Sequence, residues 1–451
     1  MGFQQGLSGL NAASKSLDVI GNNISNANTV GFKQAQVQFA DVYANSLSGG
    51  ASSNTVGIGV KVSTIAQQFT QGNISSTNNP LDIAINGNGF FRMSKNGAIT
   101  YTRNGQFQLD KSGAIVNASG QNLTGYLADV NGVLSTGSAS PITINTADIA
   151  PAQTSKISGV MNLDSRENVP GTQIPVTVPP VVTPIAFSPT DPTSYNKSTS
   201  VTVFDSLGNS HVLQTYYVRI NPVTTPPATA GTIEWNVFAT IDGNRFDATG
   251  ALTPTGTAAS PIGKLAFNNL GKLTGAIPAY AATDPRALNM IVPVSSGAVT
   301  PINTTANIKF DYTNSTQFGS DFSVSSMKQD GFTSGKLSKF NTAKDGTIIG
   351  SYTNGQTKVL GQVVLASFTD PNGLQSLGDN QWAETSDSGQ SLIGPPGSGN
   401  IGVLTSSATE DSNTDLTGEL VSMITAQRVY QANAQTIKTQ DQILQTIVNL
   451  R

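Results

Sequence analysis

The single histidine, His211, is the first candidate for a catalytic residue in this chain of 451 residues. Asp205 and Ser206 stand close before it, so the residue types of a Ser-His-Asp triad are present. They lie across a tight predicted turn, and no Gly-x-Ser-x-Gly nucleophile elbow accompanies them. Because the chain has no cysteine, thiol nucleophiles, disulfides and thiolate metal sites are also excluded. We therefore interpret His211 as a strand residue near a hairpin and expect no catalytic residues and no enzymatic activity.

Two stretches have the residue pattern of ligand-binding loops without the context that such loops need. Residues 397–402, GSGNIG, have the glycine spacing of a dinucleotide-binding turn, which must follow a strand and open a helix. Here a Pro-Pro pair precedes the motif and VLTSS follows it. Residues 411–419, DSNTDLTGE, begin like a calcium loop, but the sixth position is Leu416 instead of Gly. Helix capping explains these polar residues better, so we expect no cofactor and no metal site.

The chain is poor in charged residues, which narrows the range of partners. They make up 11% of it, against about 25% in ordinary soluble domains, and the net charge is −3. Without a run of Lys or Arg, we expect no nucleic-acid partner. No apolar run approaches the ~20 residues that span a bilayer, so we expect no membrane insertion. The start, MGFQQGLSGL, lacks the regions of a Sec signal peptide, and the absence of cysteine favours a chain that works outside the cell.

The interior of the chain has the pattern of β structure. From Gly57 onward, short apolar runs alternate with turn sequences, and two hairpins are predicted around turns at 111–113 and 205–209. Asn-Gly steps are the strongest short-range hairpin signal. They occur at Asn96-Gly97, Asn104-Gly105, Asn131-Gly132, Asn354-Gly355 and Asn372-Gly373.

A proline-rich region stands apart in the middle of the chain. Proline recurs from Pro175 to Pro192, which excludes a helix or a central strand there. Alternating strand patterns follow it, so we place an inserted β domain at about 158–321.

Both ends of the chain have helical periodicity instead. Near the N-terminus the apolar residues follow steps of three and four: Leu7, Leu10, Ala13, Leu17, Ile20 and Ile24. The same steps continue near the C-terminus, over roughly 50 Å of helix, at Leu416, Leu420, Met423, Gln427, Tyr430, Ala434, Ile437, Asp441, Leu444 and Val448. Asp415 is the expected N-cap of this second helix. Gln427 and Asp441 lie on the apolar stripe, which fits either ragged packing or polar residues that fix the register.

The two ends resemble those of a known family, the bacterial flagellar rod and hook proteins. The segment GLSGLNAASKSLDVIGNNISNANTVGFK resembles the family's N-terminal signature, especially at 27–29 and 31–33. The segment DLTGELVSMITAQRVYQANAQTIKTQDQILQTIVNL resembles its C-terminal signature. LDIAINGNGFF, residues 81–91, is similar to a segment of the family's inner β domain. QDGFTSGKL and GSYTNGQTKVLGQVVLASFTDPNGL are more similar to hook than to rod proteins.

This resemblance implies a fold that is mainly β with α-helical coiled-coil termini. The N- and C-terminal helices would pair, and β domains would be inserted between them in a nested arrangement. The expected domains are a terminal helical core domain (1–30 with 413–451), a connecting segment (31–72 with 401–412), an inner β domain (73–157 with 322–400) and an outer inserted β domain (158–321).

The resemblance also implies a structural subunit of the flagellar hook. Such a subunit polymerises with copies of itself into a curved, flexible tube that links rod to filament and transmits torque as a universal joint. Expected partners are the flagellar rod, hook-cap and hook–filament junction proteins and the flagellar type III export apparatus. The expected location is the extracellular hook of the flagellar basal body, reached without a cleaved signal peptide. Two alternatives stay open: a distal rod subunit, and an extracellular β-rich adhesin or hydrolase.

The expected subunit interface is formed by the apolar stripes of both terminal helices and by Phe32. The N-terminal helix is rich in Gly, Ser and Asn, so it needs a partner surface to be stable. We expect both ends to be loose in the free subunit and to order during assembly. Phe32 would anchor the segment NANTVGFK against a neighbour, although an ordinary linker with one packed phenylalanine is the alternative. The interface residues are Leu7, Leu10, Leu17, Ile20, Ile24, Phe32, Leu416, Leu420, Met423, Gln427, Tyr430, Ala434, Ile437, Leu444 and Val448.

Overall fold

The computed structural model describes residues 2–42, 57–129, 132–174, 181–220, 233–253, 259–281, 283–293 and 307–449. The chain forms two compact units. The terminal unit comprises Met1–Thr146, Ser338–Ser351 and Thr357–Arg451, and the inserted unit comprises Ala147–Leu337 and Tyr352–Gln356. The mainly β fold with paired terminal helices is confirmed. The finer division into four domains stays a prediction.

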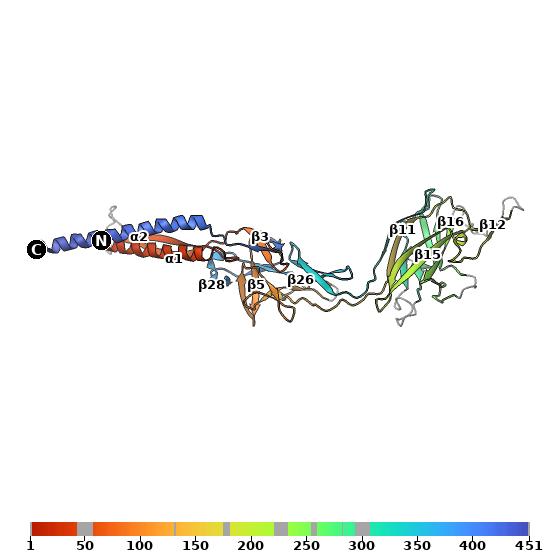
Figure 1. Cartoon of the computed structure of the whole chain (residues 1–451), viewed down its shortest axis with the longest axis horizontal. Coiled ribbons are helices and arrows are strands. Elements are labelled where there is room, and N and C mark those ends of the chain that lie inside the picture. The colour runs from red at the N-terminus through yellow and green to blue at the C-terminus, as the bar shows by residue number, and fades with distance from the viewer. Residues whose placement is uncertain are drawn as a thin grey trace. The chain divides into compact units, whose positions relative to one another are not determined.

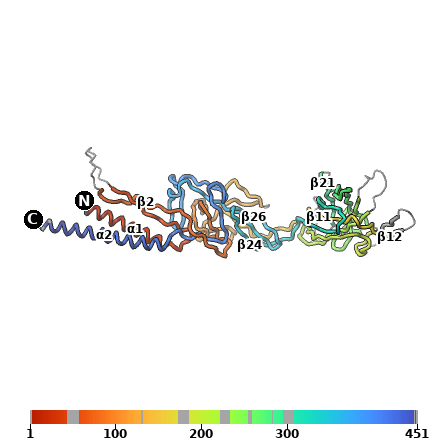
Figure 2. The backbone as a smooth tube through the Cα atoms, turned by 90° about the horizontal axis from the view of Figure 1, so that it is seen from above, coloured from red at the N-terminus to blue at the C-terminus, as the bar shows by residue number. Residues whose placement is uncertain are grey.

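Two helices lie at the ends of the chain, in the terminal unit. α1 spans Gly2–Ser25 and α2 spans Leu416–Asn449, and they lie side by side (Figures 1 and 2). They are antiparallel, because Asn23 near the end of α1 donates a hydrogen bond to Glu419 near the start of α2. Neither helix has a stretch long and apolar enough to cross a bilayer, within the residues described.

Short antiparallel strand pairs lie next to the helices in the sequence, after α1 and before α2. β1 (Ala35–Val42) and β2 (Gly59–Gln67) form a hairpin directly after α1. β3 (Ile74–Ser76) pairs with β32 (Ala408–Glu410), and β4 (Ile83–Asn86) pairs with β31 (Val403–Ser406). We call the part of the terminal unit before the inserted unit the outgoing chain, and the part after it the returning chain. The last two pairs join the outgoing chain to the returning chain. The two ends of the chain therefore enter the large sheet described next together.

One large sheet, here called the β body, makes up the rest of the terminal unit. Its main order is β24 (Leu337–Thr342), β25 (Thr347–Tyr352), β26 (Thr357–Val363), β9 (Asn122–Leu127), β5 (Phe90–Lys95), β6 (Ala98–Thr102), β29 (Gln381–Ala383) and β28 (Gln375–Gly378). The short strands β7 (Gln108–Leu109), β8 (Ile115–Val116), β10 (Ser140–Pro141), β27 (Leu365–Ser367) and β30 (Leu392–Gly394) pair beside this path. Phe90, Tyr101 and Trp382 are among the buried side chains of its aromatic core. Segments from both sides of the inserted unit therefore form one sheet.

The inserted unit contains two sheets with a common core. The first has the order β20 (Ala279–Ala281), β21 (Asp284–Met290), β22 (Ile308–Asp311), β11 (Lys156–Asn162), β23 (Ser323–Gln329). The second has the order β14 (Lys197–Phe204), β15 (Ser210–Ile220), β16 (Ile233–Ile241), β18 (Gly263–Phe267), β19 (Leu273–Ile277), with β17 (Asn244–Arg245) beside β16. Trp235 and Tyr217 from the second sheet and Phe310 from the first lie in one cluster and are fully buried. The unit therefore buries its own large side chains.

The proline-rich region forms no part of these two sheets. β12 (Gly171–Ile174) pairs only with β13 (Val181–Pro184) among the described strands. The prolines between these strands lie outside the described residues. The nearby single turn η1 (Pro192–Ser194) is capped by Asp191.

The predicted hairpins have mixed outcomes. The turns at 111–113 and 205–209 and the turns at Asn96-Gly97 and Asn354-Gly355 connect paired strands, as predicted. Asn104-Gly105 is not such a turn: a Cβ on Gly105 would lie 1.7 Å from the carbonyl oxygen of Ile83, so glycine permits a close approach of two chain segments.

Two further Asn-Gly predictions differ in outcome. Asn372-Gly373 belongs to the single turn η2 (Pro371–Gly373) instead of a hairpin, because the side chain of Asp370 caps that turn. Asn131 lies outside the described residues.

Gly31, in the segment that leaves α1, also permits a close approach of two chain segments, as Gly105 does. Its φ is +70°, a left-handed conformation that favours glycine. A Cβ at this position would lie 2.6 Å from the backbone nitrogen of Asn104 and 2.7 Å from the backbone carbon of Arg103. Both backbone strain and lack of space therefore require glycine in the motif GFK.

His211 lies in β15 beside the β14–β15 turn, which confirms it as a strand residue near a hairpin. It is 5% exposed. Its Nδ1 lies 2.7 Å from Asp242 Oδ2, and its Nε2 lies 3.3 Å from Asp205 Oδ2. Because carboxylates only accept hydrogen bonds, the charged imidazolium satisfies both contacts. Burial lowers the pKa of His211, but the hydrogen bonds and charges of the two aspartates outweigh it and raise that pKa above 6.5.

The raised pKa predicts a pH-dependent stability of the inserted unit. His211 stabilises the fold fully below the unfolded-state pKa of about 6.5, and this stabilisation is lost as pH rises through the folded-state pKa. The melting temperature of the wild type should therefore fall across that window, measured by calorimetry. His211→Asn should melt lower at pH 5 and flatten the dependence. Since His211 is the only histidine, an unchanged slope in the variant would contradict the assignment.

The environment of Gly31 predicts a large loss of stability on substitution. Gly97 is the matched control, because its φ is +86° while nothing lies within 4 Å of its Cβ position. Gly97→Ala should cost about 1–2 kcal/mol of unfolding free energy from backbone strain alone. Gly31→Ala should cost clearly more, since the backbone of Arg103 and Asn104 must also move. Denaturant unfolding of the two variants measures the difference, and equal losses would show that the close approach is unimportant.

Candidate subunit interface

The predicted interface residues differ in exposure within one chain. Ile20 is buried. Those that are half-buried are Leu10, Leu17, Ile24, Phe32, Met423, Ala434 and Ile437. Those that are exposed are Leu7, Leu416, Leu420, Gln427, Tyr430, Leu444 and Val448. The pairing of α1 with α2 thus brings together part of the predicted set and leaves the other part facing outward.

Small residues are buried in both helices, in addition to Ile20 of α1. Ala13 of α1 and Ala426 of α2 are buried, at 5% and 8% exposure. Ala426 stands next to the predicted Gln427, which is exposed. The contact face of α2 is therefore rotated relative to the predicted stripe, and leucines of the stripe are left uncovered.

Two glycines of α1 set how closely the helices approach. A Cβ on Gly6 would lie 3.0 Å from Cγ1 of Ile437, and one on Gly9 would lie 2.8 Å from the side-chain oxygen of Asn433. Larger residues at these positions would push the helices apart. The glycines that weaken α1 as an isolated helix therefore allow its close packing on α2.

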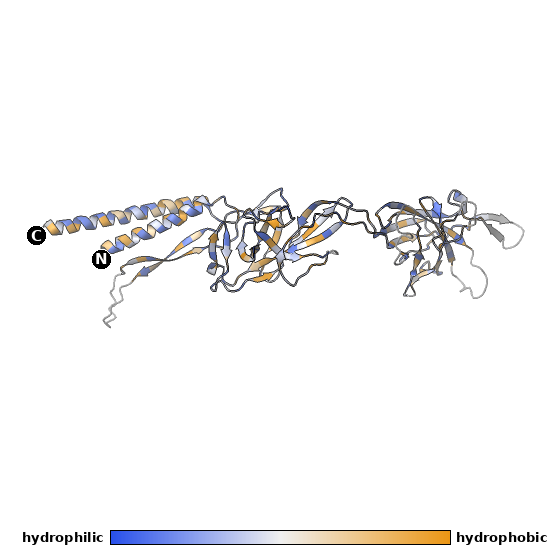
Figure 3. Ribbon diagram, turned by 90° about the horizontal axis from the view of Figure 1, so that it is seen from below, coloured by the Kyte–Doolittle hydropathy of each residue, from blue (hydrophilic) through white to orange (hydrophobic). Residues whose placement is uncertain are grey.

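The longer helix extends beyond the shorter one. α2 has 34 residues and α1 has 24. The end of α2 lies past the start of α1 (Figure 1), and it carries Ile443, Leu444 and Val448 in exposed positions. Apolar residues occur along both helices (Figure 3). The helical pair thus presents apolar side chains that nothing in the described part of the same chain covers.

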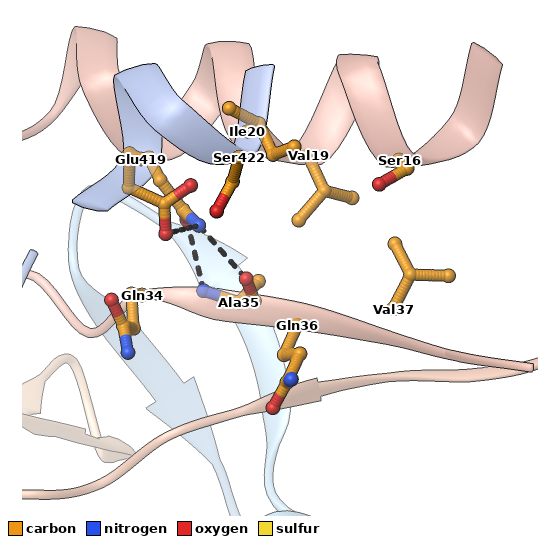
Figure 4. Close-up of a pocket in the computed structure, with 10 residues that line it drawn as sticks. Ser16, Val19, Ile20, Gln34, Ala35, Gln36, Val37, Glu419 and Ser422 are labelled. Atoms are coloured by element: carbon orange, nitrogen blue, oxygen red, sulfur yellow. Dashed lines mark hydrogen bonds between the residues drawn. The ribbon is translucent and has the colours of Figure 1, made fainter. Parts of the chain in front are cut away.

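Asn23 joins the two helices to the hairpin. Its amide nitrogen donates to the carbonyl oxygen of Ala35 at 2.9 Å and to Glu419 Oε1 at 3.2 Å, and its oxygen accepts from the N–H of Ala35 at 2.9 Å (Figure 4). Asp415 accepts from the backbone N–H of Thr417 at 3.0 Å, which confirms the predicted N-cap. The start of α2 and the end of α1 are therefore held at fixed positions on β1.

A hollow of about 270 Å³ lies beside Asn23. Apolar side chains such as Val19, Ile20 and Val37 and polar ones such as Gln36 and Glu419 line it (Figure 4). Its volume is just under the roughly 300–1,000 Å³ of ordinary small-molecule sites. It gives no reason to assign a cofactor.

Three buried charges meet where the helices join the β body, and none of them was among the predicted residues. Glu410 Oε1 lies 2.6 Å from Lys33 Nζ, and Glu410 Oε2 lies 3.0 Å from Arg103 Nη1. The side chains of Lys33 and Glu410 are 0% exposed. Burial lowers the pKa of both cations, while the charge of Glu410 acts in the opposite direction. Because these residues are far apart in the sequence, no local spacing indicates their contact.

The two loop-like motifs have structural roles. Residues 397–402 form a turn between β30 and β31, so a strand follows the motif where a dinucleotide site needs a helix. In the stretch 411–419, Asn413 accepts from the N–H of Gln34 at 2.8 Å and donates to the carbonyl of Gln68 at 2.7 Å. Capping and tethering thus explain the polar residues before α2.

Matches to family descriptions cover most of the chain. Residues 3–33 match "Flagella basal body rod protein" and residues 84–162 match "Flagellar hook protein FlgE/F/G D1 domain". Residues 162–332 match "Flagellar basal body protein FlaE D2 domain". Residues 405–450 match "Flagellar basal body rod FlgEFG protein C-terminal".

Proteins of similar sequence match this chain over nearly its full length. "Flagellar hook protein FlgE" of Salmonella typhimurium is 42% identical over 455 residues, which cover 100% of both chains. The protein of that name from Borreliella burgdorferi is 32% identical and covers 99% of this chain and 98% of its own. Among solved structures, Helicobacter pylori FlgE2 has 13% identity and a TM-score of 0.49, over 73% of this chain and 98% of that one. The full-length identities and the matching signatures at both termini show that this chain belongs to the family of flagellar hook proteins.

Proposed function

We propose that this chain is the structural subunit of the flagellar hook and polymerises through its terminal helices. The observation that carries this proposal is the surplus of exposed apolar side chains on the helical pair. These side chains are Phe3, Leu7, Leu416, Leu420, Val421, Ile424, Val429, Tyr430, Ile443, Leu444 and Val448. Fully burying one large apolar side chain stabilises by about 1.5–3 kcal/mol. Contacts between helices of neighbouring copies can therefore supply the free energy of assembly.

The polymer is a curved, flexible tube that connects rod to filament and transmits torque. Its contacts at the two ends are with rod, hook-cap and hook–filament junction proteins. The flagellar type III apparatus exports the chain, without a cleaved signal peptide, to the hook outside the cell. Two features support this route: the chain has no cysteine, and α1 is poor in strong helix formers and so passes easily as unfolded chain.

The alternatives account for fewer observations. The similarity to hook proteins over the whole chain and the large inserted unit favour a hook subunit over a distal rod subunit. An adhesin or hydrolase would not require two apolar helical ends. The chain belongs to a family of structural proteins, which also favours the hook subunit.

Removal of both helices should separate folding from assembly. A fragment of residues 31–411 should be a soluble, β-rich monomer, because the buried cores of the β body and the inserted unit remain. It should form no tubes in electron microscopy under salt conditions in which the full chain polymerises. Tubes formed by this fragment would exclude the helices as the assembly interface.

The helical ends should gain order on assembly. Circular dichroism of the full chain should show less helix in the free subunit than in the polymer, because α1 is weak without partner surfaces. Residues 31–411 provide the baseline without either helix. Equal helix content in the two states would contradict coupled folding and assembly.

Close packing of α1 on α2 should be necessary for polymerisation. Gly6→Leu places a side chain against Ile437, whereas Gly21→Leu meets nothing within 4 Å of its Cβ. Both changes raise helix propensity, by up to about 1 kcal/mol, so propensity cannot explain a difference between them. Gly6→Leu should weaken assembly by about 1–3 kcal/mol per subunit, as an overpacked contact does. The critical concentration, measured by sedimentation, should rise for this variant only; equal values would show that the helices need not pack closely.

A further inference from the structure

We propose that the cluster of Lys33, Glu410 and Arg103 is a positioning lock. It fixes the register in which the chain leaving α1 and the chain entering α2 pass each other on the β body. This inference rests on the proposed function only for its consequence in assembly, where every subunit must present its helices in the same direction.

Glu410 is the centre of the lock, through both its backbone and its side chain. Its carbonyl oxygen accepts a hydrogen bond from the N–H of Gly31 at 2.7 Å. Its carboxylate accepts from the N–H of Gly72 at 3.0 Å, in addition to its contacts with the two cations. One residue of the returning chain is therefore bonded to three separate segments of the outgoing chain, at 31–33, 72 and 103.

The two cations make further hydrogen bonds to the backbone of the outgoing chain. Lys33 Nζ also donates to the carbonyl oxygen of Thr70 at 2.7 Å. Arg103 Nη2 donates to the carbonyl oxygen of Gly87 at 2.9 Å, and its guanidinium lies 5.4 Å from the ring centre of Phe90. The β body thus supplies one partner through Arg103, and the segment leaving α1 supplies the other through Lys33.

Stability alone does not explain this arrangement. Two buried positive charges share one carboxylate, so the cluster keeps a net positive charge away from water, which costs free energy. An apolar contact of the same size would avoid that cost. What the ions add is selectivity for one register of the two segments. A shift of either segment by one residue would leave a buried charge unpaired, whereas apolar side chains tolerate such shifts.

The backbone amide of Gly31 reports the register in every variant, because its acceptor is the backbone carbonyl of residue 410. We expect Glu410→Gln to speed hydrogen exchange at Gly31, followed by NMR on the unpolymerised full chain, by roughly 100-fold or more, since it leaves two cations unpaired. Glu234→Gln is the control, because Glu234 pairs with Lys264 at 3.5 Å at a partly exposed site. It should change exchange at Gly31 by less than about fivefold.

Lys33→Met separates positioning from stability. The substitution leaves Arg103 and Glu410 as a balanced pair, so a cluster that serves only stability should give an equal or higher melting temperature and unchanged exchange at Gly31. A positioning lock instead gives faster exchange at Gly31, by tenfold or more, with a melting temperature close to that of the wild type. Unchanged exchange at Gly31 in this variant would overturn the proposal, even if Glu410→Gln proved too unstable to measure.

The test is independent of the proposed function. Exchange is measured on free subunits, so a wild-type chain that never polymerises would refute the hook function and leave the exchange result intact. If the chain polymerises, Lys33→Met should also raise the critical concentration at least tenfold. A normal critical concentration, together with normal exchange, would refute the lock alone.

Discussion

The structure depends on one constraint: the terminal helices carry more apolar surface than a single chain can cover. Packing of α1 on α2 buries small residues such as Ala13 and Ala426, while leucines of the predicted stripe such as Leu7, Leu416 and Leu420 stay exposed. In an ordinary domain this would be a defect that leads to aggregation. In the polymer proposed above, the same surface would supply the driving force of assembly. The glycines of α1 follow from the same constraint, since they lower the stability of the isolated helix and permit close contact in the assembled one.

Apolar contacts attract the helices to their partners but do little to fix their orientation. The chain uses its few charged residues to fix that orientation. Only 11% of the residues are charged, yet three of them meet in a buried cluster where the helices join the β body. In addition, Asn23 bonds to the backbone of Ala35 in the hairpin, and Asn413 bonds to the backbone of Gln68, which is distant in the sequence. A flexible linker would let each subunit place its helices independently. The many polar contacts at the junction with the β body hold the helices in one direction instead, which a regular polymer needs.

The sequence allowed prediction of those features that local patterns determine. Helical periodicity located both helices, Asp415 was recognisable as a cap, and Asn354-Gly355 marked a true hairpin. Asn104-Gly105 could not be distinguished from such a hairpin turn. A glycine required by a tight turn and a glycine required by a close tertiary approach look the same in sequence. The rotation of α2 that buries Ala426 instead of Gln427 depends on the shape of α1. The pairing of Glu410 with Lys33 joins residues at opposite ends of the chain, and no local pattern encodes it.

The inserted unit and the helical pair differ in the origin of their stability. The inserted unit encloses its large aromatic side chains, among them Trp235 and Phe310, in a core of its own. Its stability therefore comes from contacts within the single chain. The helical pair leaves apolar side chains uncovered within one chain. If it assembles as proposed, contacts with further copies would stabilise it by mass action. If the helices assemble as proposed, this division leaves the β cores folded in a single chain and makes the order of the helices depend on the neighbouring copies.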